Sequence, residues 1–478
     1  MPIRMTPQPD YDRLRRAIAG EVLEPASAGY DTARAMWNGA VDRHPAAILR
    51  CTATADVAAA VRFATDAQLP LTVRGGGHGF SGLAIADDSL LIDTSPMKRI
   101  TVDRERSRAF AQPGVLGGEL DRATQAHALA TTLGTISHTG IAGLTLGGGW
   151  GWLMRQYGLT CDNLISAEVV LADGQTVRAS EVAHPDLFWA LRGGGGQFGA
   201  VTEYEYALHP LDPYVTVSQW VFAPDAGCRP LLTARDIAAD PDRARDMFIT
   251  SMCLPDSPQL PEHLRGARAY VILCMSTNTS DRDGAWMAPL AQHRPLAAVT
   301  GPRPYVDLQA IADLQNPYGL LAHCKGAFIT ELTDQALMTF VEQAEQLQGT
   351  SLMYLHQMGG AVGDVRDGET PLQCRSADYA LNIVARWEDP EGEATARMFA
   401  GQAAAAFDRF GMDTVPLNFE GDPVGLESRI YGSSLPRLKE IKAKLDPHDV
   451  FGGAHPAVPE ARVAAIADVR PGPSAVGV

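Results

Sequence analysis

The sequence predicts an α+β fold in which a glycine-rich first part is followed by a sheet covered by helices. Short strand patterns, helix patterns and glycine clusters alternate up to about residue 210. Beyond that point glycine becomes sparser, and longer strand and helix patterns alternate. A chain of 478 residues also exceeds what one hydrophobic core usually organises. We therefore expect three units, at 1–210, 211–415 and 416–478.

The first elements predict a β-α-β unit. Residues 12–18 form a mixed helical pattern, and residues 47–49 form a short apolar strand pattern. Thr54 is a suitable N-cap for a helix with apolar residues at 57, 61 and 64, and a strand pattern follows at 71–73. We expect this unit to bury a short pair of parallel strands.

The later elements are predicted from the same apolar periodicity. The first unit continues with strand 90–93, strand 109–111, helix 116–130, strand 167–172, helix 186–191 and strand 201–208. The rest of the chain gives strand 270–275, helix 334–347, strand 352–357, strand 379–387, helix 391–410 and helix 435–444. The tail after Arg470 is rich in proline and glycine and is predicted to be disordered.

The charge balance limits the classes of partner. The chain carries 40 basic and 56 acidic residues, a formal net charge of −16. Nucleic acids and anionic membranes reward basic patches, so we expect neither as a partner. An anionic substrate stays compatible with this balance, because a site can be locally basic.

The cysteines and the N-terminus indicate a compartment. Seven cysteines, an odd number without a CxxC pair, argue against a disulfide framework and a metal site, so we expect reduced thiols. The N-terminus lacks the apolar core of a signal peptide, and no apolar run reaches the roughly 20 residues that a membrane helix needs. We therefore expect a cytoplasmic protein.

Four glycine clusters are the most distinctive feature, and they lie at 74–79, 142–151, 192–199 and 451–453. Glycine loses more conformational freedom on folding than other residues, so its repeated use indicates backbone that approaches a ligand closely. Backbone N–H groups in such loops can hold phosphate groups. Three clusters lie within about 130 residues beside predicted strands, which favours a ligand site over ordinary turns.

Several common motifs are excluded. The segments 77–82 and 194–199 both match GxGxxG, but neither opens a helix, as the dinucleotide-binding fingerprint requires. The sequence contains no GxxxxGK[ST], HExxH or GxSxG motif and no metal-spaced cluster of histidine and cysteine. A nicotinamide dinucleotide, a P-loop and a metal centre are therefore not expected.

His78 is the candidate reactive residue of the first glycine cluster. It follows three glycines, where its side chain can approach a ligand. A neutral imidazole nitrogen is a competent nucleophile, and the ordinary pKa of histidine keeps much of it neutral near pH 7. A single histidine is more often structural, so this interpretation depends on its glycine-rich setting.

Six motifs together make the chain resemble one family, the berberine-bridge-enzyme-like oxidases of the vanillyl-alcohol-oxidase (PCMH-type) FAD fold, and within it the bacterial 6-hydroxy-D-nicotine oxidase-like branch. The motifs keep their order over nearly the whole chain. They are RGGGH at 74–78, LLIDTS at 90–95, QPGVLGGEL at 112–120, GIAGLTLGGGWGWLMRQYGLTCDNL at 140–164, LFWALRGGGGQFGAVT at 187–202 and YGSSLPRLKEIKAKLDPHDVF at 431–451.

The resemblance implies a PCMH-type FAD-binding domain over 1–210, a substrate domain with a helix-covered antiparallel sheet, and a C-terminal segment that packs back on the FAD domain. His78 matches the histidine joined to the flavin 8α-methyl group. The further residues implied to hold FAD are Arg74, Gly75, Gly76, Gly77, Gly79, Ser81, Gly82, Thr139, Gly140, Gly143, Gly147, Gly148, Gly149, Asp162, Asn163, Gly199 and Val201.

Two positions depart from the family pattern. Many relatives make a second flavin link from a cysteine, where this chain has Ile136. Cys161 lies too far along the chain to replace it, so we expect a single covalent bond. The position that the family uses to gate oxygen is Thr139, where valine is usual in oxidases. The resemblance therefore leaves open whether O2 or another acceptor takes the electrons.

The substrate side is predicted from the strand 352–357, whose alternation places Tyr354 and His356 on one face. Asn382 occupies the approximate place of the glutamate base of plant relatives, and an amide cannot take a proton. Tyr354 and His356 are then the candidate acid–base groups. The resemblance adds Asn418 near the flavin edge and Tyr431 as a further candidate.

These observations predict an oxidoreductase that moves hydride from a small molecule to FAD, with O2 as the expected acceptor and peroxide as product. The substrate classes are a secondary-metabolite alcohol, a sugar or a cyclic amine. Two alternatives stay open: a flavin enzyme that catalyses cyclisation, dehydration or dehydrogenation without O2, and a non-catalytic flavin carrier.

Overall fold

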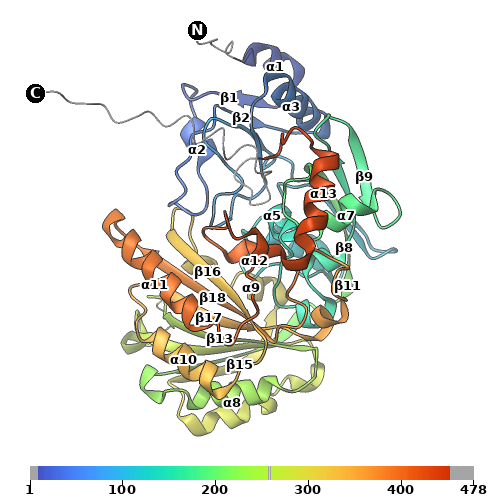
Figure 1. The fold of residues 1–478 in the computed structure, drawn as a ribbon. Helices are drawn as coiled ribbons and strands as arrows, with labels where there is room; N and C mark the ends of the chain where they lie inside the picture. The colour runs from blue at the N-terminus through green and yellow to red at the C-terminus, as the bar shows by residue number, and fades with distance from the viewer. Residues whose placement is uncertain (1–8, 257, 259, 453–478) are drawn as a thin grey trace, which may run out of the picture.

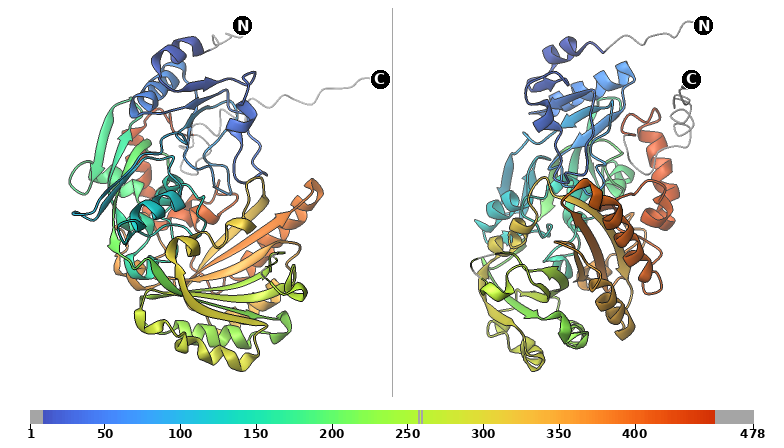
Figure 2. Two further views of the ribbon diagram at one scale, coloured as in Figure 1. Left: turned by 180° about the vertical axis from the view of Figure 1, so that it is seen from behind. Right: turned by 90° about the vertical axis from the view of Figure 1, so that its left-hand side faces the viewer.

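The computed structural model describes residues 9–256, 258 and 260–452. Figure 1 shows the N-terminal part above a large sheet, with helices on the outer side of that sheet. Figure 2 shows the same two layers from behind and from the side. The predicted disordered tail after Arg470 lies outside the described residues.

A small, mainly parallel sheet begins the N-terminal part. Its strand order is β1-β2-β4-β3, in which β1 is antiparallel and the other pairs are parallel. The strands are β1 (Glu21–Leu23), β2 (Ala47–Arg50), β3 (Leu71–Arg74) and β4 (Leu90–Asp93), and the helices are α1 (Tyr11–Ala17), α2 (Tyr30–Arg34) and α3 (Thr54–Ala67). The predicted β-α-β unit forms, but β4 inserts between its two strands.

The predicted N-cap of α3 is wrong by one residue. Ala53 occupies the N-cap position, and Thr54 is the first helical residue. The Thr54 hydroxyl instead donates to Glu168 on a neighbouring strand at 2.8 Å. A tertiary partner has therefore taken the side chain that local sequence assigned to the cap.

An antiparallel sheet of order β5-β6-β10-β8-β9 follows, next to a two-stranded pair, β11-β7. These strands are β5 (Ile100–Asp103), β6 (Arg108–Ala111), β7 (Leu129–Ala130), β8 (Leu164–Val170), β9 (Thr176–Ser180), β10 (Ala200–Ala207) and β11 (His209–Pro210). The helices between them are α4 (Gly117–Gln125), α5 (Ile141–Leu146), α6 (Met154–Tyr157) and α7 (Pro185–Leu191).

The large sheet is antiparallel throughout, with the order β15-β12-β14-β13-β17-β18-β16. Its strands are β12 (Tyr214–Phe222), β13 (Arg245–Cys253), β14 (Arg268–Ser276), β15 (Ala297–Pro304), β16 (Leu321–Ile329), β17 (Leu352–Gln357) and β18 (Tyr379–Trp387). The helices of this part are α8 (Arg229–Ala238), α9 (Tyr305–Gln309), α10 (Asp334–Ala344) and α11 (Glu393–Ala406).

Helices α8, α10 and α11 cover the outer face of the large sheet, as Figure 1 shows. Met353 and Leu355 of β17 point to this side and join a core with Leu337 and Phe340 of α10. Residues 354 and 356 therefore point to the opposite face, toward the N-terminal part, as strand alternation predicts.

The C-terminal segment returns to the N-terminal part through α12 (Glu427–Tyr431) and α13 (Leu435–Leu445). Leu438 and Ile441 of α13 share a hydrophobic core with Leu187 and Phe188 of α7. The backbone N–H of Leu71 then donates to the carbonyl of Val450 at 3.0 Å, beside the start of β3.

None of the helices in the described part of the chain combines the length and apolar character needed to cross a bilayer. No group of three or more histidine, cysteine, aspartate or glutamate side chains in these residues is arranged to hold a metal ion.

Candidate functional site

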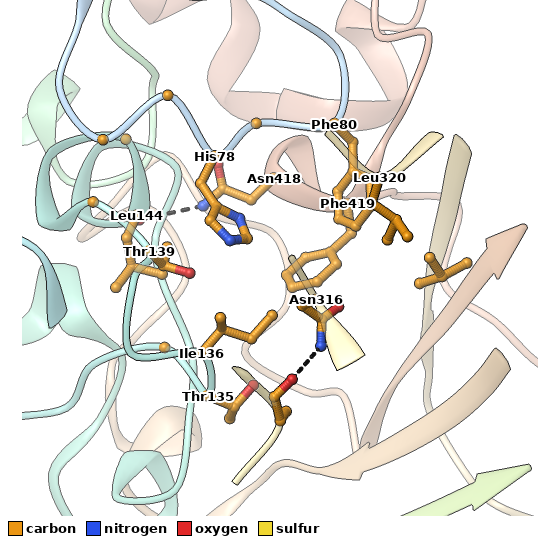
Figure 3. Close-up of a pocket in the computed structure, with 18 of the residues that line it drawn as sticks. His78, Phe80, Thr135, Ile136, Thr139, Leu144, Asn316, Leu320, Asn418 and Phe419 are labelled. Carbon is orange, nitrogen blue, oxygen red and sulfur yellow. Dashed lines mark hydrogen bonds between the residues drawn. The ribbon is translucent and has the colours of Figure 1, made fainter. Parts of the chain in front are cut away.

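A cavity of about 1100 Å³ lies between the glycine-rich part and the large sheet. One wall comes from the loop after β3 and from residues 134–147, and the other includes β17 and β18. In Figure 3, His78, Thr139 and Ile136 lie on one side of the open space, and Asn316 and Phe419 lie on the other. A drug-sized ligand needs about 300–1000 Å³, so this space suits a large cofactor together with a small molecule.

The loop after β3 packs backbone against backbone. A Cβ atom on Gly75 would lie 2.6 Å from the carbonyl oxygen of Pro113. A Cβ atom on Gly76 would lie 2.5 Å from the Cα of Gly140, which belongs to the second glycine-rich segment. Only glycine fits these positions, and the two segments together form a backbone cradle in the cavity wall.

Arg74 supports this loop from outside the cavity. Its guanidinium pairs with Asp93 of the neighbouring strand β4 at 2.9 Å and donates to the carbonyl of Ala35 at 3.2 Å. Both members of the ion pair are buried. Arg74 therefore fixes the end of β3 instead of lining the cavity, where the resemblance had placed it.

His78 lies in the cavity wall with two partners. Its ring stacks on Trp37 with a centroid separation of 4.3 Å, and its Nε2 lies 3.2 Å from Nδ1 of His138. Burial, and to a smaller degree the neighbouring His138, lower the pKa of His78 to about 3. The imidazole is therefore neutral over the physiological range, and Nδ1 is the ring nitrogen left for other chemistry.

The second glycine-rich segment contributes residues on both sides of α5. Thr139, Gly140, Gly143 and Gly147 line the cavity. Asn418 lies against Gly147, where a Cβ atom would come within 2.2 Å of the Asn418 Oδ1. The same amide donates to the carbonyl of Leu144 at 3.2 Å (Figure 3).

Gly148 and Gly149 lie behind this wall instead of lining it, and both have positive φ, of 102° and 75°. Only glycine adopts such angles without strain. A Cβ atom on Gly149 would also come within 2.5 Å of the Thr160 hydroxyl. These two residues shape the turn that follows Gly147.

Asp162 and Asn163 also lie behind the cavity wall. Both oxygens of Asp162 accept from Arg375 at 2.7 Å, and one also accepts from the N–H of Leu159 at 2.9 Å. Asn163 donates to the carbonyl of Tyr157 at 3.0 Å. These residues support the glycine-rich segment from below and do not reach the cavity.

Of the remaining predicted cofactor residues, all but one line the cavity. Gly77, Gly79, Ser81, Gly199 and Val201 line the cavity. Gly82 does not, and its φ of 72° serves a turn packed on Val41.

Tyr354 is the predicted acid–base residue that lines the cavity. Its ring contacts Phe248 of β13 at a centroid separation of 5.7 Å. Burial raises the pKa of its phenol. The raised pKa keeps the phenol neutral. Within the described part of the chain its hydroxyl makes no hydrogen bond, so it is available to a ligand.

His356, the other predicted acid–base residue, does not line the cavity. It is fully buried, its Nε2 lies 2.8 Å from Asp246 Oδ1, and its ring stacks on Phe248 at 3.7 Å. Burial raises the pKa of Asp246, with His356 acting in the opposite direction. The pair therefore lies behind Phe248, whose ring lines the cavity.

Tyr431 and Asn382 are buried near the site without lining it. The Tyr431 hydroxyl donates to the carbonyl of Gly194 at 3.2 Å and so supports the third glycine cluster. Asn382 pairs across from Tyr354 in the sheet, and neither polar atom of its amide has a hydrogen-bond partner among the described residues.

Sequence reasoning missed Trp37, His138 and Arg386. His138 lies two residues before the motif 140–164, but nothing in the spacing of residues 78 and 138 predicts their contact. Arg386 follows the Asn382 position by four residues and lines the cavity. Strand alternation from residue 382 through 384 to 386 could have placed it on the same face.

Two family sequence patterns match the chain. The FAD binding domain family matches residues 45–180, and the berberine and berberine-like family matches residues 417–456. The first region contains the glycine loop, His78 and the second glycine-rich segment. The second begins one residue before Asn418.

Individual relatives agree with these matches. An FAD-linked oxidoreductase of Dictyostelium discoideum is 26% identical over 441 residues, covering 91% of this chain and 94% of that protein. (R)-6-hydroxynicotine oxidase of Paenarthrobacter nicotinovorans is 40% identical over 195 residues, 41% of this chain and 43% of that protein.

Among solved structures, glucooligosaccharide oxidase from Acremonium strictum, described with a 6-S-cysteinyl, 8α-N1-histidyl FAD, has a TM-score of 0.81 to this chain at 24% identity. The match covers 92% of this chain and 98% of that one. This likeness establishes that the two chains share their fold.

Proposed function

We propose that this chain is a berberine-bridge-enzyme-like FAD-linked oxidoreductase, that it removes a hydride from a carbon of a small molecule and that His78 holds its FAD covalently. The observation that carries the proposal is a neutral histidine in the wall of a large, glycine-cradled cavity. When bound, FAD would supply the acceptor for the hydride, with O2 as the proposed final acceptor of the electrons.

The cavity fits a flavin dinucleotide. Gly75, Gly76 and Gly77 present backbone without side chains, which suits the close approach of a diphosphate. Thr139, Gly140, Gly143 and Gly147 would flank the ring and the ribityl chain, and Gly199 and Val201 would hold the adenosine side. All of these residues line the one cavity.

His78 is suited to attachment by its protonation state and its orientation. A protonated imidazole has no lone pair for bond formation, and the low pKa of His78 keeps it unprotonated. The contact with His138 occupies Nε2 and leaves Nδ1. The likeness to an oxidase whose flavin is 8α-N1-histidyl supports the same nitrogen here.

A second covalent link is not part of this proposal. Ile136 stands in the cavity wall where many relatives have the linking cysteine, and a hydrocarbon side chain cannot form a thioether. Cys161 is buried away from the cavity. Cys253 does line the cavity, but at the end of β13, where its thiol contacts the carbonyl of Gly349 at 3.0 Å.

Tyr354 is the group that we assign to the substrate. Its neutral phenol can accept a hydrogen bond from a substrate O–H or N–H group, or donate one to the substrate. Either contact would orient the adjacent C–H bond. Asn382 has no proton-accepting group at neutral pH. A neutral amine can release hydride without first losing a proton, because its nitrogen lone pair stabilises the iminium that forms, whereas an alcohol must give its O–H proton to a base. The asparagine at this position therefore favours an amine over an alcohol as substrate.

The experiment that tests the proposal is a substrate screen without air. Purified protein should be yellow, and a substrate should bleach the flavin absorbance near stoichiometrically. Readmission of air should restore the colour and release peroxide. Protein that binds no flavin, or holoenzyme that no alcohol, sugar or amine bleaches, contradicts the proposed oxidation.

The covalent link has its own test, the variant His78→Ala. In the wild-type protein, acid precipitation should leave the flavin with the pellet. In His78→Ala any flavin should appear in the supernatant, because no second link remains. His44→Ala, the same change at an exposed histidine, should behave as the wild type. Flavin retained in the His78→Ala pellet overturns the assignment.

A second candidate function is favoured by Thr139, which lines the cavity where oxidases of the family usually have valine. A hydroxyl there changes the polarity of the path that O2 would use. In this reading the enzyme catalyses either a dehydrogenation, with another electron acceptor in place of O2, or a cyclisation or dehydration without O2. Slow reoxidation in air after complete bleaching, with fast reoxidation by a quinone, supports it.

A further inference from the structure

Arg386 is the basic residue that faces the substrate side of the cavity. It lies near the end of β18 with Val384 before it on the same face, and both line the cavity. Its guanidinium donates to the carbonyl of Gln315 at 3.0 Å and to the Asn316 Oδ1 at 2.7 Å. Its Nε is buried without a hydrogen-bond partner among the described residues.

The charge on Arg386 has no carboxylate partner. Its protein partners are neutral oxygens, and no ion pair in the described part of the chain includes it. Burial lowers its pKa to about 10, which still leaves it cationic at neutral pH. Arg74 and Arg375, two buried guanidiniums outside the cavity, each pair with an aspartate instead. Burying an uncompensated cation costs free energy, which an anionic ligand would recover.

The cavity as a whole has the opposite charge bias to the chain. The protein carries a formal net charge of −16. The charged residues that line the cavity are Arg386, Arg303 and Asp256, and Asp256 is exposed at the rim. This distribution leaves a cationic interior in an acidic protein, which favours an anion over a cation as the bound small molecule.

Resting on the oxidoreductase function proposed above, we propose that the substrate carries a carboxylate, and that Arg386 binds this group while Tyr354 contacts the part of the substrate that is oxidised. The two side chains lie on the same face of neighbouring strands, β17 and β18, within electrostatic range of each other. An anchored carboxylate at Arg386 therefore sets which carbon reaches the flavin. Guanidinium is suited to this task because its planar N–H groups match a carboxylate.

The diphosphate of FAD is a second anion that enters this cavity, and its place is different. The glycine loop that suits a diphosphate follows β3 in the N-terminal part, whereas Arg386 and its partners Gln315, Asn316 and Thr350 belong to the large-sheet part. Flavin content therefore separates the two roles. Loss of flavin on substitution of Arg386 assigns the guanidinium to the cofactor and overturns the proposal.

The test uses the holoenzyme and matched pairs of small aryl ligands, beginning with benzoate and benzamide and extending to hydroxy- and amino-substituted acids with their amides. Binding is measured by the change in flavin absorbance, and oxidation by bleaching without air. The acids should bind more tightly than their amides. Arg386→Gln should weaken acid binding by about 10- to 100-fold, the usual effect of losing a hydrogen bond to a charged group, and leave amide binding unchanged.

Two further variants separate the effect of the charge from a structural effect of the side chain. Arg386→Lys keeps the cation and should keep part of the preference for acids, which a purely structural role of the guanidinium would not produce. Arg104→Gln removes one charge at an exposed position without an ion pair in the described residues and should behave as the wild type. All variants are compared at equal covalent flavin content.

The outcomes separate this inference from the proposed function. Equal affinity for acids and amides in the wild type, or an acid preference that survives Arg386→Gln, overturns the carboxylate assignment. If a neutral compound bleaches the flavin in the same experiment, the oxidoreductase function stands without it. A protein without flavin overturns both.

Discussion

At the scale of single residues, His78 shows how a side chain gains a function from its contacts. The sequence alone contains twelve histidines, and the three glycines before this one are what distinguish it. The structure adds Trp37 on one face of the ring and His138 at Nε2. These contacts fix the plane of the ring, so that Nδ1 has one direction in which to react.

The contact with His138 leads to a prediction about attachment. Formation of a bond at Nδ1 requires that the imidazole lose its proton, and His138 is placed to accept it from Nε2. In His138→Phe we expect FAD to bind with a lower covalent fraction. The measurement is the ratio of flavin in the acid pellet to total flavin, followed over time after addition of FAD to apoprotein.

A matched control keeps this prediction specific. Ser137→Ala changes the neighbouring residue, whose hydroxyl hydrogen-bonds to Asp313 and not to His78. It should attach flavin at the wild-type rate. Complete and equally fast attachment in His138→Phe would show that His138 has no part in the reaction.

At the scale of elements, the success of sequence reasoning depended on whether local pattern alone decides the structure. The predicted strand 379–387 matches β18, and the predicted helix 435–444 differs from α13 by one residue. Strand β15 was missed because it contains Gly301, Pro302 and Pro304. It lies at the edge of the large sheet, where the missing N–H donors of proline are tolerated.

The predicted helix 116–130 fails for a related reason. Helix α4 ends at Gln125, and Ala128 has a φ of 54° that no helix accommodates. Leu129 and Ala130 then pair with β11. A strand partner some eighty residues away decides this boundary, and no local pattern in the sequence contains it.

In the candidate site, too, local patterns could be predicted and long-range contacts could not. The glycine cradle and His78 could be predicted because glycine clusters and the motif order are local properties. The positions of Arg74, Asp162 and His356 behind the wall could not, because ion pairs with Asp93 and Arg375 hold the first two there and a hydrogen bond with Asp246 holds the third. Each partner comes from another strand or segment of the chain.

Helix α4 also carries a buried acid that should make stability depend on pH. Asp121 faces α9, where Gln309 donates to its Oδ2 at 3.0 Å, and its Oδ1 has no hydrogen-bond partner among the described residues. Burial raises the pKa of Asp121 to about 7, with Gln309 and Arg122 acting in the opposite direction. Aspartate in an unfolded chain titrates near pH 4, so between about pH 4 and 7 only the folded protein keeps the proton.

Because the folded state binds more protons in this window, the free energy of unfolding falls as the pH rises through it and stays lower above pH 7. Asp121→Asn cannot ionise, so we expect it to be more stable than the wild type at pH 8, by on the order of a few kcal/mol, and nearly equal at pH 4 to 5. Urea unfolding at both pH values measures the difference.

Asp225→Asn is the control, since it makes the same chemical change at an exposed residue. It should leave the difference between the two pH values unchanged. A stability of Asp121→Asn that follows the wild type at both pH values would mean that Asp121 is ionised in the folded protein without penalty.

At the scale of the whole molecule, the cavity depends on parts of the chain that are far apart in sequence. Residues between Leu71 and Phe451 line it. The N-terminal part supplies the glycine cradle, the large sheet supplies Tyr354 and Arg386, and the C-terminal segment supplies Asn418 and Phe451. Substrate and cofactor would therefore meet only when all three have folded together.

The C-terminal segment is held in place by a buried charge cluster at the end of α13. Lys442 donates to Asp446 at 2.6 Å and to the carbonyl of Gln197 at 3.0 Å, and both charged residues are about 2% exposed. Asp446 in turn accepts from the backbone N–H groups of Val450 and Phe451 at 2.7 and 2.8 Å. The cluster thus connects Gln197 of the third glycine cluster to Phe451, which lines the cavity.

Lys442→Ala should loosen this connection. It removes one partner of a buried ion pair and leaves the charge of Asp446 uncompensated, which typically costs about 3–5 kcal/mol. We expect a lower melting temperature and weaker retention of FAD in a His78→Ala background, where no covalent bond masks the affinity. Lys444→Ala, an exposed lysine on the same helix, should change neither. If Lys442→Ala lowers the melting temperature but leaves the dissociation constant of FAD unchanged, the cluster stabilises the C-terminal segment without shaping the cavity.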